Sequence, residues 1–465
     1  MPEALLAGAA QVEITPQAGV HLSGDIGAYR PAQVVLDPLY ARVLVLESGA
    51  QRLCLVGLDV TIITAPWTER IRQQAASLGF PPEAVMVHAT QTHSAPGVGH
   101  FMLDEDFPAP PELEWLRGGE TPYAQQAVAG AAAALRLACS RLQPVSVAAG
   151  SALRDGLAHN RRGITREGGA IMPWLYSSRD LPLGPTNLRC LEGPTDPEVG
   201  VVCLRSAQGR LVAMLLHFSC HPVNVFAQPP NLVVSADWPG AWAAQMGGSY
   251  GQDCVFLVIN GCCGNLNPWP AFQPDFFPDH RRMGRELAET ADRVVRRLAF
   301  REGAALDCRV RQVPLPVREL QPPALDQAAA LLREHPTPIW TDESKTRVRA
   351  DWMSAALAMS VHLMRQREPR LAYQVQAFRI GEVAIVGLPG EPFVEGQLRI
   401  KIGSPTYPTY LAHCTNQYVG YLPTREAFPR GGHEVNLSYW SKLAPEALDL
   451  AVQAALDLLG ELFPG

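Results

Sequence analysis

Side chains that are capable of catalysis stand in five loops, each of which directly follows an apolar run of the sequence. The loops carry imidazole, thiol, carboxylate, amide and phenol groups; they are 91–97 with His93, 220–224 with His221, 260–268 with Cys262 and Cys263, 387–391 with Glu391, and 416–421 with Tyr418 and Tyr421. Such groups can hold a metal ion or attack a carbonyl carbon. Taken singly, each also has an ordinary structural role, because loop histidines are usually hydrogen-bonded, a carboxylate complements a helix N-terminus, and a buried tyrosine packs in the core.

The elements around these loops predict an α/β fold. Apolar runs that predict strands are 53–59, 84–89, 199–204, 211–218, 254–259, 382–387 and 407–412. Patterns that predict helices are 66–78, 123–142, 280–299, 323–334, 349–366, 391–402 and 444–460. This alternation is typical of a mixed, largely parallel sheet flanked by helices. Because ligands bind beside the carboxyl ends of strands in such sheets, we expect the five loops to share one cleft.

The chain reads as one large catalytic domain over residues 1–465. Prolines are frequent in 306–345, which suggests an inserted segment within 306–370. The chemically capable loops lie on both sides of this segment, so we interpret it as an insertion and not as a domain boundary. We expect no C-terminal β-sandwich domain.

Composition and charge exclude several classes of protein. The formal net charge is −6 and no basic stripe is present, which argues against nucleic acid as a partner. No apolar run is long enough to span a membrane, and the N-terminal residues lack the features of a secretory signal. Ten cysteines are scattered without CxxC pairs, so we expect a cytoplasmic, reduced protein. Nothing in the sequence indicates an oligomeric state.

Several short segments together resemble a known family. In this order and at these separations, they are similar to the catalytic domain of the neutral, non-lysosomal ceramidases; the segments are 90–97, Asn160–Arg161, 196–198, 235–237, 264–268, 385–391 and 416–421. Each segment alone is a weak pattern, and their joint occurrence is what carries the resemblance.

The resemblance implies a metal site and a reaction. One zinc ion per chain would be held by His93, His221, Glu391 and Tyr421, with Tyr418 as the competitor for the fourth position. A zinc-bound water would attack the carbonyl of a linear amide in a small or N-acylated substrate. Arg161 would orient a polar group of the substrate, and Tyr421 or His433 would donate to the oxyanion. The resemblance also implies catalytic importance for Asn267, and we expect substrate contacts from Arg161, Asn265, Gln91 and Tyr418.

The sequence departs from the ceramidase pattern at two of these positions. Asn267 replaces a serine, so a serine nucleophile is not available there, and His433 replaces a tyrosine. Because a secretory or membrane segment is also missing, we expect a soluble amide as substrate in place of ceramide.

Four alternatives remain open at this stage. The first is a zinc-dependent esterase, and the second is a phosphoesterase that uses Asp59 or Asp237 as an additional carboxylate. The third is a thiol nucleophile at Cys262 or Cys263, activated by His221. The fourth is a non-catalytic binding protein on the same scaffold. His88 and His217 lie inside predicted strands, and we assign both a structural role.

Overall fold

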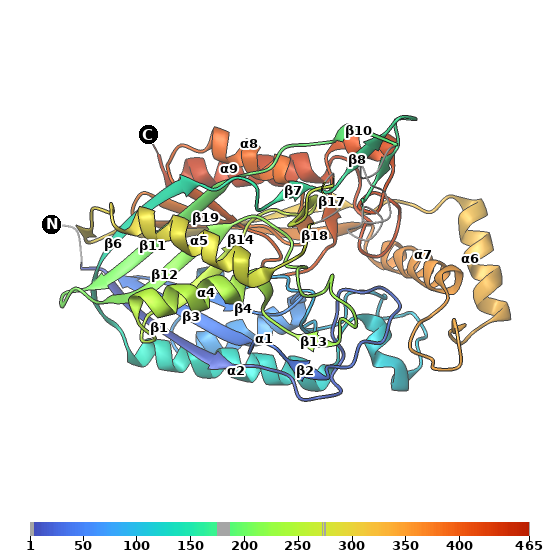
Figure 1. Ribbon diagram of the computed structural model, residues 1–465, viewed down its shortest axis with the longest axis horizontal. Helices are drawn as coiled ribbons and strands as arrows, with labels where there is room; N and C mark the ends of the chain where they lie inside the picture. The colour runs from blue at the N-terminus through green and yellow to red at the C-terminus, as the bar shows by residue number, and fades with distance from the viewer. Residues whose placement is uncertain (1–3, 174–186, 272, 274–275, 465) are drawn as a thin grey trace.

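Three β layers meet around a common apolar core (Figure 1). The computed structural model describes residues 4–173, 187–271, 273 and 276–464. Its nine-stranded sheet runs in the order β14 (Val255–Asn260), β12 (Leu211–Phe218), β11 (Glu198–Ser206), β6 (Gln143–Leu153), β1 (Leu6–Glu13), β3 (Tyr40–Ser48), β4 (Gln51–Leu58) and β5 (Val85–Ala89), with β16 (Arg301–Glu302) beside β6. A four-stranded sheet runs β17 (Leu306–Pro316), β18 (Arg370–Ile380), β19 (Val383–Gly387) and β21 (Thr409–Ala412).

The large sheet doubles back on itself, because β6 and β1 pair over two residues only. Beyond that point β14 contacts β3 and β4, which lie far from it in the strand order. The two halves and the four-stranded sheet therefore turn their inner faces toward one another. Leu55 on β4, Leu257 on β14 and Ile385 on β19 belong to the same buried cluster.

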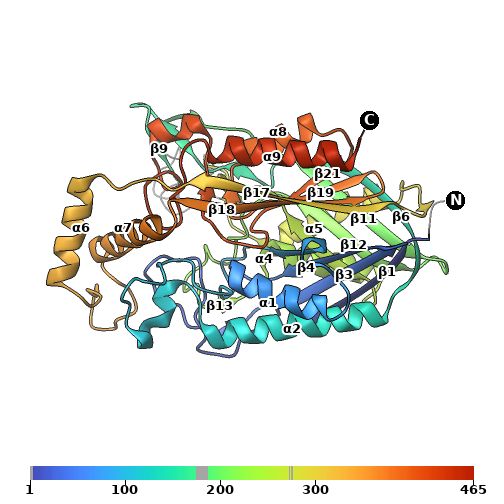
Figure 2. The same cartoon turned by 180° about the vertical axis from the view of Figure 1, so that it is seen from behind.

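Helices cover the outer face of each layer (Figures 1 and 2). The half formed by β1, β3, β4 and β5 is covered by α1 (Ala65–Ala76) and α2 (Thr121–Ser140). The half formed by β6, β11, β12 and β14 is covered by α4 (Asp237–Tyr250) and α5 (His280–Val295). The four-stranded sheet is covered by α8 (Val394–Gly403) and α9 (Ala447–Leu462), and α7 (Ala350–Arg367) packs into the same apolar cluster beyond the end of the sheet. No helix in the described part of the chain is long and apolar enough to cross a membrane.

The mixed α/β class and all the predicted strands and helices are confirmed, with ends that shift by a few residues. One boundary is wrong in kind, because residues 391–392 form the short strand β20 (Glu391–Pro392) and the helix starts only at Val394.

The expectation of a largely parallel sheet is wrong. Among the described strands of the two main sheets, only β14–β12, β4–β5 and β19–β21 pair in parallel. The physical reason is the length of the connections. Gly49 and Ala50 alone join β3 to β4, and Gly381 and Glu382 alone join β18 to β19. A two-residue connection can only form a hairpin, which is antiparallel.

The predicted insertion over 306–370 is not confirmed. Residues 306–316 form β17, which pairs with β18 along its whole length, from Leu306 opposite Ile380 to Pro316 opposite Arg370. β17 is an edge strand, where proline is tolerated because one side of the strand needs no N–H donor. Only the connection that carries α6 (Pro322–Glu334) and α7 leaves the sheet, and Trp352 of α7 is buried in the cluster beneath β17 and β18.

Candidate active site

The five loops meet at one place, as the sequence predicts. Hydrogen bonds join them in series. The N–H of His93 donates to the Pro222 carbonyl at 3.1 Å, and the Asn260 side-chain amide donates to the Cys220 carbonyl at 3.0 Å. The N–H of Gly264 donates at 3.1 Å to the carbonyl of Pro392, which directly follows Glu391, and the N–H of Gly390 donates to the Gln417 carbonyl at 3.2 Å. His93 follows β5, His221 follows β12, and Glu391 follows β19. Each of the three β layers therefore contributes one of the predicted ligands.

Glu391 and Tyr421 are positioned by a two-residue parallel bridge. β20 pairs with β22 (Tyr421–Leu422), and Glu391 lies directly opposite Tyr421. Partners in register extend to the same side of the bridge. Glycines precede both residues, and a Cβ atom at Gly420 would lie 2.2 Å from the Trp440 carbonyl oxygen. Only glycine lets the chain pass this closely.

His221 and Glu391 face each other through atoms that have no hydrogen bond. Nε2 of His221 lies 3.1 Å from Oε2 of Glu391, and both atoms are buried. Nδ1–H of His221 donates to the Cys263 carbonyl at 2.7 Å, so the lone pair of the neutral ring is on Nε2. Burial, together with the positive charge of Arg161, lowers the pKa of His221. Burial raises the pKa of Glu391, whereas the hydrogen bond from Tyr418 and the positive charge of Arg161 act to lower it.

A lone pair therefore faces a carboxylate, which is unfavourable unless a cation lies between them. Two ligand atoms of a tetrahedral zinc ion, each bound at 2.0–2.2 Å, would be separated by about 3.4 Å. The measured separation of 3.1 Å is close to that spacing. These two residues fit a zinc ion.

His93 and Tyr421 lie beside this pair. The ring of His93 is 5.5 Å from that of His221, and its buried Nδ1 has no hydrogen bond. Within the described residues, however, no group of three or more His, Cys, Asp or Glu side chains is arranged to hold a metal ion. The four-ligand set stays a prediction.

Arg161 connects several of the predicted catalytic residues. It follows β7 (His159–Asn160), which pairs with β15 (Leu266–Asn267). The buried guanidinium donates to Glu434 at 2.8 Å, to the Tyr421 hydroxyl at 2.9 Å and to the side-chain oxygen of Asn267 at 3.4 Å. Because the Tyr421 oxygen accepts this bond, its own proton is free to be donated elsewhere. Burial raises the pKa of Tyr421 well above its ordinary value, which favours the protonated phenol in the absence of a cation.

This fold matches that of two solved ceramidase structures. Neutral ceramidase from Pseudomonas aeruginosa superimposes with a TM-score of 0.71 at 19% identity, covering 100% of this chain and 75% of that chain. A structure of ceramidase complexed with C2 gives a TM-score of 0.71 at 18% identity, covering 99% of this chain and 75% of that chain. The chain has the neutral ceramidase fold. No protein-family model and no curated protein matches the sequence.

The ceramidase fold confirms the resemblance that the sequence motifs carry. At this level of identity the match shows the architecture alone. Three of the predicted residues can be placed with respect to the His221–Glu391 pair.

Tyr418 orients Glu391. Its hydroxyl donates to Oε1 at 2.7 Å and leaves Oε2 facing His221. Asn265 and Gln91, which we expected to contact substrate, both have hydrogen-bond partners within the protein, and their contact with substrate stays a prediction. The Asn265 amide bridges the backbone N–H of Val394 and the Glu395 carboxylate at the start of α8. The Gln91 side chain is buried and accepts from the Cys263 thiol at 3.7 Å.

His433 lies next to Tyr421, with 5.6 Å between the ring centroids, and its other face stacks on Trp440. Burial lowers its pKa, so at neutral pH its ring is uncharged and carries one N–H donor. The structure therefore brings His433, Tyr421, Arg161 and Asn267 together beside the predicted ligands.

The thiol alternative, in which His221 activates Cys262 or Cys263, is not supported by the geometry; the Cys263 sulfur lies instead 3.4 Å from Nδ1 of the buried His413. Cys262 and Cys263 are fully buried, and burial raises the pKa of both thiols. His221 uses Nδ1 for the Cys263 carbonyl and turns Nε2 toward Glu391, so it does not face a sulfur atom as a base.

The additional carboxylates of the phosphoesterase alternative are already paired. Asp59 forms an ion pair with Arg42 at 2.5 Å. Asp237 accepts from Asn224 at 3.0 Å and from the backbone N–H groups of Val225 and Trp238.

The contacts of His88 support the structural role expected for the two strand histidines, and that role stays a prediction for His217. His88 accepts from the Asn260 N–H at 3.0 Å and donates to the His413 carbonyl at 2.6 Å, so both its ring nitrogens are paired. The buried ring of His217 stacks on Tyr410 at 5.0 Å.

Sequence reasoning missed two residues that shape the site. Glu434 is buried between Arg161 and Arg162, at 2.8 Å and 2.7 Å. Glu434 directly follows His433 in the sequence, and this position beside a predicted catalytic residue could have identified it as part of the site. Arg30 donates to the His93 carbonyl at 3.0 Å across 63 residues of sequence, and no local pattern reveals such a contact.

Proposed function

We propose that the protein is a zinc-dependent amidohydrolase that cleaves the C–N bond of a small or N-acylated linear amide. The observation that carries the proposal is the buried pair of His221 Nε2 and Glu391 Oε2, 3.1 Å apart and without a hydrogen bond. His93 and Tyr421 would complete the ligand set. A zinc ion held there would supply a Lewis acid that polarises a carbonyl and lowers the pKa of a water molecule.

The polar residues around the pair suit the transition state of amide hydrolysis. Its negative charge develops on the carbonyl oxygen, and donors fixed in a buried site stabilise that charge. Arg161 brings a buried positive charge, held in place by Glu434 and by Tyr421. The His433 ring, which lies against Tyr421, and the Tyr421 hydroxyl, if it is not bound to the metal, are candidate donors to the carbonyl oxygen.

Asn267 supports a mechanism without a serine nucleophile. Its side-chain oxygen accepts from Arg161 at 3.4 Å, so it fixes the guanidinium and leaves an amide N–H₂ as a donor. An amide group cannot form an acyl intermediate. The two ceramidases that share the fold support an N-acyl amide as the substrate class.

Elemental analysis and a substrate panel test the proposal. We expect one zinc ion per chain in the wild-type protein, and its loss together with turnover in His221→Ala and in Glu391→Gln. His100→Ala is the matched control, because this exposed histidine is hydrogen-bonded to Glu114 on the surface and is not one of the predicted ligands. The control should keep both zinc and activity.

The panel contains N-acyl amides, including ceramide, together with carboxylic and phosphate esters. Turnover of amides supports the proposal. Turnover of only one ester class would replace amide cleavage with that reaction. A metal-free protein that is inactive on the whole panel would favour the binding-protein alternative.

A further inference from the structure

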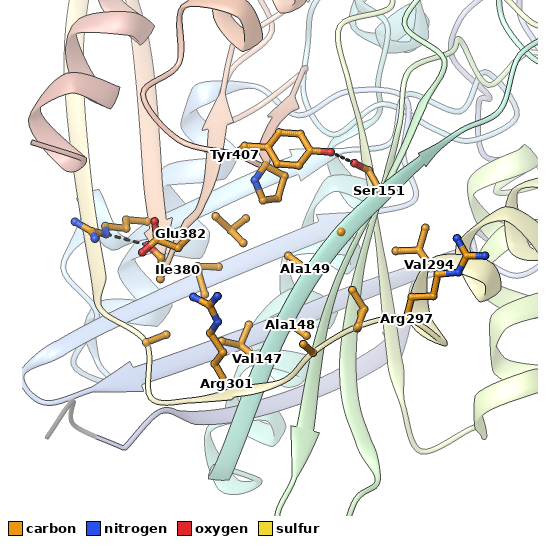
Figure 3. A pocket seen from close by; sticks show the side chains of 18 of the residues that line it. Val147, Ala148, Ala149, Ser151, Val294, Arg297, Arg301, Ile380, Glu382 and Tyr407 are labelled. Carbon is orange, nitrogen blue, oxygen red and sulfur yellow. Dashed lines mark hydrogen bonds between the residues drawn. The ribbon is translucent and has the colours of Figure 1, made fainter. Parts of the chain in front are cut away.

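A cavity lies at the opposite end of the four-stranded sheet from Glu391. It has a volume of about 670 Å³ and is lined by β6, the end of α5, residues 299–305, the β18–β19 turn and Tyr407 (Figure 3). Val383, at the start of β19, lines it, whereas the other end of β19 leads to Glu391. The cavity is therefore separate from the candidate active site. Its size falls within the range of small-molecule sites.

The floor of the cavity is a strand edge without a neighbour. β6 pairs with β11 from Val145 to Leu153. On its other edge, β1 pairs with residues 143–144 and β16 with residues 146–147. No described strand continues the sheet beyond this point. The side chains there are small, namely Ala148, Ala149 and Gly150, with Leu298 and Val294 packed directly over Gly150. Ile380 extends this apolar surface on the other side of the cavity.

The rim of the cavity is positively charged. Four arginines line it, against a single carboxylate, Glu382; the arginines are Arg293, Arg297, Arg301 and Arg379. In the described part of the chain, neither Arg297 nor Arg301 forms a side-chain hydrogen bond or ion pair with another residue. Arg301 lies opposite Val147 of β6, and its guanidinium extends over the floor (Figure 3). The local excess of positive charge contrasts with the net charge of −6 of the whole chain.

We infer that this cavity binds an anionic amphiphile, with its charged head on Arg301 and its apolar tail along the β6 floor. A guanidinium presents paired N–H donors that match a sulfate, phosphate or carboxylate group. Burial of an alkyl chain on the floor contributes favourable free energy in proportion to the area covered. The inference does not depend on the proposed amidohydrolase activity.

Calorimetric titration with octyl sulfate, below its critical micelle concentration, tests this site. We expect one saturable site in the wild-type protein. 1-Octanol lacks the charge and inorganic sulfate lacks the tail, so each should bind at least tenfold more weakly. Arg301→Glu should weaken octyl sulfate binding at least tenfold.

The matched control is Arg296→Glu. Arg296 is exposed at the end of α5, pairs with Asp292 and does not line the cavity, so its reversal should change the affinity less than twofold. A further control, His221→Ala, should bind octyl sulfate as the wild type does. Unchanged binding in Arg301→Glu, equally tight binding of 1-octanol, or loss of binding in His221→Ala would each overturn the assignment.

Discussion

At the scale of single residues, Arg30 shows how a buried charge can serve the site without touching it. Its guanidinium donates to the carbonyl groups of Ser23 at 2.7 Å, His93 at 3.0 Å and Asn231 at 2.8 Å. It has no hydrogen bond to a carboxylate, and burial lowers its pKa to about 10. The Arg30 guanidinium thus connects three segments that are remote in sequence, and it fixes the backbone of His93 relative to the other two.

Arg30→Lys should therefore weaken the site while preserving the charge. A lysine ammonium is a point charge and cannot reach three carbonyl groups in the way the planar fork does. Residues that hold metal ligands in place typically contribute about 10–100-fold to metal affinity or activity. We expect a loss of that size in zinc affinity, measured by competition with a chelator, and a parallel loss in turnover. Arg347→Lys, at an exposed pair with Asp25, is the control. Unaltered zinc affinity in Arg30→Lys would show that Arg30 does not position His93.

At the scale of elements, local signals predicted much of the structure. Apolar runs located β5, β12, β14 and β19, and the polar loops after them form the candidate site. Helix α4 was missed, because its sequence is rich in alanine and glycine and packs both Trp238 and Trp242 into the core, so it shows no amphipathic pattern. The sequence also did not predict that Glu391 pairs with Tyr421, because a strand of two residues is too short to show an alternating pattern.

The first residue of α5 should make stability depend on pH. Nε2 of His280 lies 3.1 Å from Asp37. Burial alone would lower the pKa of His280, but the hydrogen bond to Asp37 and the nearby charge of Asp237 raise it above 6.5 overall. A raised pKa means that the folded protein binds the proton more tightly than the unfolded chain does. The stabilisation is therefore complete below about pH 6.5 and is lost as the pH rises through the folded-state pKa.

His280→Gln should remove this dependence. We expect the variant to be less stable than the wild type at pH 5.5, with a difference that shrinks toward pH 9, as measured by urea denaturation. His362→Gln is the control, since that histidine is hydrogen-bonded to Gln366 within α7 and forms no ion pair among the described residues. A difference between His280→Gln and wild type that stays constant with pH would contradict this account.

At the scale of the whole molecule, the sequence predicted that the loops converge but not how. The α/β class followed from the alternation of patterns. The doubling back of the large sheet depends on where β6 and β1 separate, and on contacts such as β14 with β3, which are set by packing between distant segments. The same long-range packing determines that His93, His221 and Glu391 extend from three different β layers.

A cation held between those layers would cross-link them, and this gives a prediction about stability. Any ligand that binds only the folded protein stabilises it by an amount set by its concentration relative to its Kd, about 2.7 kcal/mol at a 100-fold excess. After treatment with a chelator, addition of zinc to that level should raise the free energy of unfolding by this amount, measured by urea denaturation. Glu391→Gln should lose most of the gain, because it weakens the link between the four-stranded sheet and the other two layers. If zinc raised the free energy of unfolding equally in the wild type and in Glu391→Gln, Glu391 would not be a ligand. The zinc would then bind elsewhere on the molecule.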